Sequence, residues 1–187
     1  LILRLKQQYF FCSASFQDIV AKYKKKYGSD FSKFAELYSI QLNDTHPTVS
    51  IPELIRILMF KEGTSFNDAF DIAQKTFNYT NHTVMAEALE CWGEDLFRTR
   101  LPRIYQIVCE INRRLVNELS GIYGDDRAKI EYMAVISNNQ VKMANLCLAC
   151  CHKINGVSAL HTEILKNGIF RDYYNIGQEK FINVTNG

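Results

Sequence analysis

Apolar residues recur at intervals of three and four along much of the chain, the spacing of helices that bury one face. The longest such run follows Pro102 and predicts a helix of roughly four turns, broken by SGIYGDD at 120–126. Its predicted buried face consists of Ile104, Val108, Ile111, Leu115 and Leu119. The same spacing predicts four further helices, over 15–28, 52–62, 65–77 and 157–167.

Local signals mark the starts of these helices. Ser15 and Ser65 each stand three residues before an aspartate, the pattern of a helix N-terminal cap. Pro52 fits a first helical turn, because the N–H that proline lacks is not needed there. In the last helix, the apolar positions expected to point inward are Val157, Leu160, Ile164 and Leu165.

Three extended segments alternate with the helices. Residues 39–44 and 77–84 predict short strands, and the continuous apolar run at 141–156 predicts a strand buried on both faces, as in parallel sheets. The order strand, helices, strand, helices, strand, helix predicts an α/β layer joined by right-handed crossovers.

Polar residues cluster where each predicted strand ends. The clusters are NDTHP at 43–47, TNHT at 80–83 and CHKING at 151–156, and a fourth, VTNG at 184–187, closes the sequence. In open α/β sheets, ligands bind outside the carboxyl ends of the strands. We therefore expect these clusters to form one site.

Composition restricts the partners of that site. The 187 residues suit one domain or a large piece of a bigger one, and both ends are abrupt enough to suggest a segment of a longer protein. Lys plus Arg is 22 against 20 for Asp plus Glu, a net charge of +2 that gives no reason to expect nucleic acid or an anionic membrane. No apolar run approaches the ~18 residues of a membrane helix.

The six cysteines favour a reducing, cytoplasmic setting, because most lie in apolar surroundings and a chain of this length needs no disulfides. CLACCH at 147–152 is one residue too long for the haem-attachment pattern. A redox CxxC pair belongs at the mouth of a helix, whereas this one falls within the predicted strand. We interpret these cysteines as packing residues.

The first polar cluster leaves three alternatives open. Asp44 and His46 could form an acid–base pair, could bind a metal together with His82 and Glu87, or could fix a turn and shape a pocket. Before the predicted helix at 157–167, the backbone N–H groups of Gly156 and Val157 are candidate donors to a ligand.

Hydrogen-bonding side chains that suit sugar hydroxyls predominate in these clusters. They are Asn43, Asp44, His46, Asn81, His82, Asn155 and Asn186. This inventory indicates a polyhydroxylated ligand without naming one.

Five stretches together resemble the glycogen/α-glucan (maltodextrin) phosphorylase family, more closely its bacterial members. They are QLNDTHPTVSIPELIRILM, YTNHTVMAEALECW, LPRIYQIVCEINRR, VKMANLCLACCHKINGVSALHTEILK and KFINVTNG, and they cover nearly the whole chain in the family's order. The resemblance implies a helix-rich α/β fold with a small parallel sheet, part of a Rossmann-like lobe of a two-lobed, GT-B type glycosyltransferase. Residues 1–187 would be the C-terminal portion of the N-terminal lobe.

The resemblance also implies a reaction. Such enzymes use inorganic phosphate to release glucose 1-phosphate from α-1,4-glucans, as homodimers, with pyridoxal phosphate on a lysine of the C-terminal lobe. No lysine here matches that position, so we expect the segment to be inactive without the missing lobe.

The resemblance also implies roles for six residues of this sequence. By resemblance, His82 is the catalytic contact to the glucosyl unit, around its 6-hydroxyl and near the reacting centre. Asn186 binds the same hydroxyl, and Val157 lines that pocket. By the same resemblance, Asp44 and His46 lie beneath the β-face of the sugar. Glu87 matches a glutamate in the family's mobile segment after the second strand.

Two stretches depart from the family pattern, and two other functions stay open. ECWG at 90–93 stands where the family commonly has ERWP, which we expect to loosen a helix start, and Cys151, His152 and Lys153 stand where it has Ser-His-Ala. A noncatalytic carbohydrate-binding or scaffold module of the same fold, or a Cys/His metal or redox module, would also account for these residues.

Overall fold

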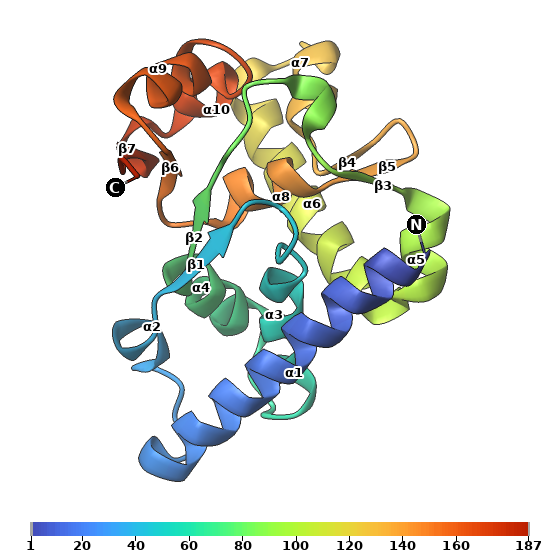
Figure 1. Cartoon of the computed structure of the whole chain (residues 1–187). Helices are drawn as coiled ribbons and strands as arrows, with labels where there is room; N and C mark the ends of the chain where they lie inside the picture. The colour runs from blue at the N-terminus through green and yellow to red at the C-terminus, as the bar shows by residue number, and fades with distance from the viewer. Residues whose placement is uncertain (1, 187) are drawn as a thin grey trace.

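Ten α-helices and two small sheets make up residues 2–186, the part of the chain that the computed structural model describes (Figure 1). The helices are α1 (Ile2–Tyr27), α2 (Phe34–Leu37), α3 (Ser50–Phe60), α4 (Phe66–Thr76), α5 (Glu94–Arg100), α6 (Pro102–Tyr123), α7 (Arg127–Met133), α8 (Met143–Cys150), α9 (Ala159–Asn167) and α10 (Arg171–Ile176). The strands are β1 (Ile40–Asn43), β2 (Phe77–Thr80), β3 (Cys91–Gly93), β4 (Ile136–Ser137), β5 (Gln140–Lys142), β6 (Ile154–Gly156) and β7 (Phe181–Asn183). Two 3₁₀ turns, η1 (Ala86–Ala88) and η2 (Gln178–Lys180), complete the set.

The larger sheet has the order β1-β2-β6-β7, and all its pairings are parallel. Asn43 lies opposite Thr80, Thr80 opposite Asn155, and Asn155 opposite Ile182. The smaller sheet, β3-β5-β4, is antiparallel. The expected helix-rich α/β architecture with a small parallel sheet is confirmed.

Helix α3 lies at the centre of the helical layer, packed against α1, α4 and α6 (Figure 1). Its first six residues are all buried. The five apolar residues predicted to line α6 are buried as well. Helix α6 ends before Gly124, whose φ of 57° is the left-handed conformation that favours glycine.

A buried ion cluster joins α1 to α3. Glu53 is fully buried, and its carboxylate accepts hydrogen bonds from Ser13 Oγ at 2.7 Å and Tyr9 Oη at 3.1 Å. Arg56 adds two bonds of 2.7 Å from Nε and Nη2. Each of these neighbours donates to the buried carboxylate, and Arg56 supplies the opposite charge.

The first predicted helix boundary was wrong, because α1 starts thirteen residues before Ser15, at Ile2. Ser15 lies within the helix, and its hydroxyl donates to the carbonyl of Phe11 at 2.8 Å instead of capping a new helix. Leu5 and Cys12 extend the buried face of α1 upstream, so packing favours one long helix. The cap at Ser65 is confirmed, since its hydroxyl accepts from the Asp68 N–H.

The predicted strand at 141–156 was also wrong. It divides into the end of β5, helix α8 and strand β6. Helix α8 is covered on nearly all sides, so its apolar residues show no helical period, and periodicity cannot separate such a helix from a buried strand. The cysteines do pack as expected: Cys147, Cys150 and Cys151 are buried, and burial raises the pKa of the last two thiols.

Residues 91–93 form β3, whose Trp92 is buried in the core, and Gly93 is the N-cap of α5 without a side-chain hydrogen bond to the helix start. One further expectation failed. In α9, Leu165 is buried, whereas Leu160 is 73% exposed and Ile164 is 42% exposed.

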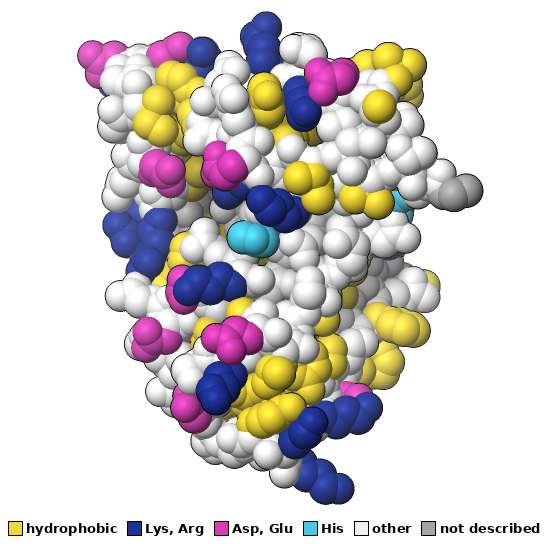
Figure 2. All heavy atoms as spheres, turned by 90° about the vertical axis from the view of Figure 1, so that its left-hand side faces the viewer, with side chains coloured by type: hydrophobic (Ala, Val, Ile, Leu, Met, Phe, Trp, Pro, Cys, Tyr) yellow, Lys and Arg dark blue, Asp and Glu magenta, His cyan; other side chains and the backbone are white. Residues whose placement is uncertain are grey.

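The surface carries charges of both signs. Figure 2 shows Lys and Arg side chains interspersed with Asp and Glu on one face, with smaller apolar patches between them. This mixture creates no one-signed field that would attract a polyanion. Among residues 2–186, no helix is both long enough and apolar enough to cross a membrane.

We predict that Glu53→Ala lowers the free energy of unfolding by about 3–5 kcal/mol, because it leaves the Arg56 charge without its buried partner. Urea denaturation followed by circular dichroism measures the change. The control is Asp71→Ala, which removes an exposed partner of Lys75 and should cost no more than about 1 kcal/mol. Equal effects of the two substitutions would contradict a special role for the buried cluster.

Candidate functional site

Four expected site residues lie just beyond the carboxyl ends of four neighbouring parallel strands. Asp44 comes directly after β1, His82 two residues after β2, Val157 directly after β6 and Asn186 three residues after β7. Because the strands are parallel, these positions meet at one edge of the sheet, which we call the polar edge. It comprises residues 43–47, 80–87, 155–162 and 183–186.

The turn after β1 is shaped by Asp44. This residue has a φ of 70°, a left-handed conformation that aspartate tolerates better than most residues. Its Oδ1 accepts from the Thr45 N–H at 2.6 Å, and its own N–H donates to the Thr80 carbonyl at 2.9 Å. The carboxylate thus fixes the turn, and no hydrogen bond joins it to His46 among the described residues.

A histidine contact ties the end of β2 to the end of β1. His82 Nε2 lies 2.5 Å from Asn43 Oδ1. An amide oxygen can only accept, so Nε2 carries the proton in this contact, and in the tautomer with that single ring proton Nδ1 is an acceptor. The next turn is held by Asn81, whose Oδ1 accepts from the Thr83 N–H at 2.9 Å and whose Nδ2 donates to Tyr79 Oη at 3.0 Å.

A row of polar side chains runs beneath this edge. Asn155 Oδ1 accepts from Thr80 Oγ1 at 2.8 Å and from Gln41 Nε2 at 3.2 Å, which links β1, β2 and β6 through side chains. Asn155 Nδ2 donates to the Gly156 carbonyl at 3.0 Å. Below the row, burial raises the pKa of the Tyr79 phenol well above its usual range, so it stays neutral. The row therefore contains no charge.

The turn after β6 corrects one expectation. The Val157 N–H, a candidate ligand donor, donates to His161 Nδ1 at 3.1 Å and is already used within the chain. The Val157 carbonyl accepts from the Asn186 N–H at 3.1 Å. Both backbone polar groups of Val157 are thus fixed, and its side chain remains half-buried at the edge.

His161 is the residue that sequence reasoning missed. It lies in the first turn of α9, where its N–H donates to Ser158 Oγ at 3.1 Å, and its Nε2 lies 3.4 Å from the Thr83 carbonyl. The signal was available, because a serine three residues before a histidine places the imidazole beside the helix start. The apolar spacing of this segment indicated Val157, Leu160, Ile164 and Leu165 instead.

The polar edge is open to solvent. Asp44 and Val157 are half-buried, and His46, His82, Glu87 and Asn186 are exposed, with Glu87 in η1. Among the described residues, no three His, Cys, Asp or Glu side chains are grouped to hold a metal ion. The polar edge is therefore an open surface that does not enclose a ligand.

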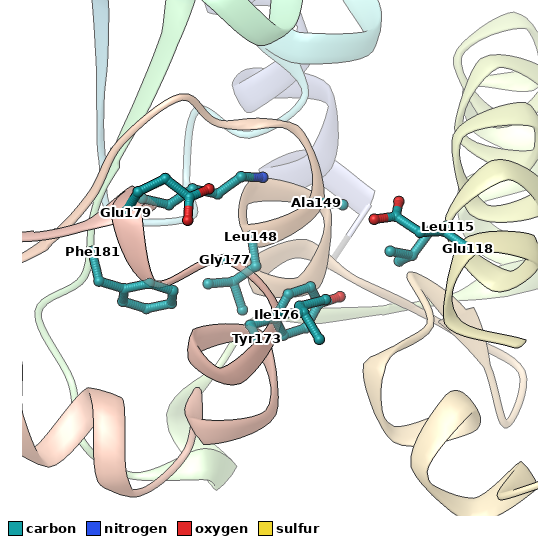
Figure 3. Close-up of a pocket in the computed structure, with 10 residues that line it drawn as sticks. Leu115, Glu118, Leu148, Ala149, Tyr173, Ile176, Gly177, Glu179 and Phe181 are labelled. Atoms are coloured by element: carbon teal, nitrogen blue, oxygen red, sulfur yellow. The ribbon is translucent and has the colours of Figure 1, made fainter. Parts of the chain in front are cut away.

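A separate cavity of about 180 Å³ lies beside the start of β7, away from the polar edge (Figure 3). Leu148, Ile176 and Phe181 contribute apolar surface to it, and Figure 3 shows Glu118 and Glu179 on opposite sides. None of the six expected site residues lines this cavity. Its position gives it no part in the polar edge.

The architecture is that of an α/β protein, and the polar edge lies at the strand ends, the position where open α/β sheets bind ligands. Residues 1–187 match the family described as carbohydrate phosphorylase. The chain belongs to this family.

Individual relatives agree with that assignment. The chain is 45% identical over 194 residues to the α-glucan phosphorylase H isozyme of Triticum aestivum, with all of the chain aligned. It is 44% identical to the cytosolic α-glucan phosphorylase 2 of Arabidopsis thaliana over 194 residues, and 45% identical over 195 residues to the muscle form of glycogen phosphorylase of Rattus norvegicus. The aligned share is 100% of the chain for the Arabidopsis protein and 99% for the rat protein. In each case the chain spans 23% of the relative's length.

We predict that Gly156→Ala disturbs the polar edge. An added Cβ would lie 2.7 Å from Thr162 Oγ1, 2.9 Å from Thr162 N and 3.0 Å from His161 Nδ1. Displacing these groups should lower the unfolding free energy by about 1–3 kcal/mol. Denaturant titration tests this.

The matched control is Gly121→Ala, in α6, where the added Cβ meets open space. A helical alanine there should stabilise by about 0.5–1 kcal/mol. Unchanged stability of Gly156→Ala would contradict this prediction, because it would show that the turn after β6 accommodates a Cβ without displacing its neighbours.

Proposed function

We propose that this chain supplies the sugar-binding wall of an α-1,4-glucan phosphorylase. In this proposal the longer protein uses inorganic phosphate to release glucose 1-phosphate from glycogen or maltodextrin. Residues 1–187 form the C-terminal portion of its N-terminal lobe. The observation that carries the proposal is the convergence of Asp44, His82, Val157 and Asn186 on one polar edge of the parallel sheet.

His82 is the proposed catalytic residue. Its Nε2–H is committed to Asn43, so Nδ1 is the acceptor available to the 6-hydroxyl of a glucosyl unit. Asn186 supports the same hydroxyl from the other end of the edge, since its backbone N–H anchors it to Val157 while its exposed side chain remains available. The Val157 side chain lines the pocket between them.

Asp44 and His46 are proposed to shape and polarise the pocket beneath the sugar, without transferring protons. The Asp44 carboxylate holds its own turn through Thr45, which leaves it a structural and electrostatic role. Negative and carbonyl groups near the anomeric carbon would stabilise positive charge that develops there in the transition state. Glu87, exposed in η1, is proposed to contact substrate from the segment after β2.

Pyridoxal phosphate, which the family resemblance implies, does not fit this edge. The residues of the polar edge include no lysine or arginine, so neither the aldehyde nor the phosphate of the cofactor finds an amine or a cation there. We place the cofactor and the phosphate substrate on the missing C-terminal lobe, and no step of this chain is derived through them.

Apolar residues around the edge support a second lobe as its partner. Six apolar residues within or next to the polar edge are at least 40% exposed: Val84, Met85, Leu160, Ile164, Ile182 and Val184. A covering lobe would bury this surface and exclude water from the sugar. The proposal includes a homodimer, which the family resemblance implies, and a cytoplasmic location, since one relative is described as cytosolic.

The reaction is tested on the longer protein reconstituted with pyridoxal phosphate. Incubation with maltodextrin and phosphate should yield glucose 1-phosphate in a coupled assay. Absence of that product would overturn the proposal. Calorimetric titration of the 187-residue chain with maltoheptaose should give no measurable heat, whereas saturable binding would favour the noncatalytic carbohydrate-binding module.

We predict that His82→Ala in the longer protein lowers kcat by about 10²-fold or more, since it removes a contact near developing charge. Steady-state phosphorolysis measures the loss. His152→Ala is the control: this exposed histidine precedes β6, at the opposite end of the strand from the polar edge, and its replacement should leave kcat unchanged. Comparable rates for the two variants would remove His82 from the site.

A further inference from the structure

We propose that His161 is a positioning residue that sets the distance between the turns after β2 and β6, and thereby between His82 and Val157. This inference rests on the proposed function, because its consequence is the fit of a glucosyl unit between those two residues. His161 itself stands behind the polar edge and touches no reacting atom in this proposal.

The need for such a residue arises where the sheet ends. The register of β2 and β6 stops at the pair Thr80 and Asn155, and the Asn81 N–H bond to the Asn155 carbonyl at 3.0 Å is the backbone link beyond it. Thr83 and Val157 both lie past that bond. Backbone pairing therefore does not set their separation.

The imidazole of His161 bridges this gap with both nitrogens. Nδ1 accepts from the Val157 N–H at 3.1 Å, and Nε2 lies 3.4 Å from the Thr83 carbonyl. A carbonyl only accepts, so one tautomer, neutral with the proton on Nε2, satisfies both contacts. The ring is a spacer of fixed length, because an aromatic ring cannot bend.

The backbone behind the ring is itself immobilised. Ser158 Oγ accepts from the His161 N–H at 3.1 Å, and Thr162 Oγ1 donates to the Ser158 carbonyl at 2.8 Å. Thr162 Oγ1 also reaches Asn183 Oδ1 at 3.1 Å, at the end of β7. Gly156 allows this approach, because its missing Cβ would lie 3.0 Å from His161 Nδ1.

The bridge extends to a third strand end. The Val157 carbonyl accepts from the Asn186 N–H at 3.1 Å, so Thr83, His161, Val157 and Asn186 form one continuous hydrogen-bonded series. Removing the imidazole frees the turn after β6 together with the segment that carries Asn186. The glucosyl pocket would then lose its fixed width, while phosphate bound elsewhere would not be affected.

Three substitutions separate the two halves of the bridge. His161→Ala removes both contacts, His161→Asn keeps an acceptor near the Nδ1 position, and His161→Gln places an amide donor near the Nε2 position. In the longer protein we expect His161→Ala to raise KM for maltodextrin about 10-fold, the equivalent of one or two hydrogen bonds, with KM for phosphate unchanged. His161→Asn and His161→Gln should each recover part of the loss, and the His152→Asn control should match the parent.

An unchanged KM for maltodextrin in His161→Ala would overturn the inference. So would an equal rise in both KM values without recovery in the conservative variants, since that pattern indicates general structural damage.

A second measurement uses the 187-residue chain and needs no activity. Nitrogen-15 NMR should show an unprotonated Nδ1 in His161, and hydrogen exchange of the Val157 amide should accelerate at least about 10-fold in His161→Ala but not in His161→Asn. A protonated Nδ1, or unchanged exchange, would refute the bridge. If the longer protein releases no glucose 1-phosphate, the proposed function fails, and these NMR results alone decide whether His161 joins the two turns.

Discussion

The parallel direction of four adjacent strands is the constraint on which the polar edge depends. Asn43, Thr80, Asn155 and Ile182 lie at one level of the sheet, so the residues after each of them must emerge at the same side. Strands of three or four residues provide few hydrogen bonds, and β2 and β6 share only two register pairs. The sheet therefore fixes the direction of the strand ends but contributes little to holding them.

Side chains supply the missing rigidity. His82 joins the turn after β2 to Asn43 at the end of β1. His161 joins the same turn to Val157, and Val157 in turn bonds to Asn186. Beneath them Asn155 connects three strands. A site held in this way has little conformational entropy left to lose when a ligand binds. Apart from the Asp44 and Glu87 carboxylates, the donors and acceptors of the polar edge are uncharged groups that suit hydroxyl groups better than ions.

In the helical layer, a buried ion pair with its hydrogen bonds holds the elements together. The buried Glu53 carboxylate is paired with Arg56 and also accepts hydrogen bonds from Ser13 and Tyr9. This cluster fixes α1 across α3, and α3 begins a few residues after the Asp44 turn. Exposed apolar residues lie around the polar edge, near α9 and β7. They mark the surface where the proposed second lobe would complete the fold.

The sequence alone determined the features that local chemistry controls. Apolar spacing predicted the buried face of α6, Ser65 predicted the start of α4, and polar clusters after predicted strands placed Asp44 and His82 at a common edge, to which the family resemblance added Val157 and Asn186. Tertiary structure decided what depends on neighbours from distant parts of the chain. Helix α8 has no apolar period because protein surrounds it, and Ser15 is helical because α1 packs along α3 beyond it. The Val157 N–H is taken by His161, a contact that exists only once α9 has folded back over β6, because a hydrogen bond between two turns depends on the position of both.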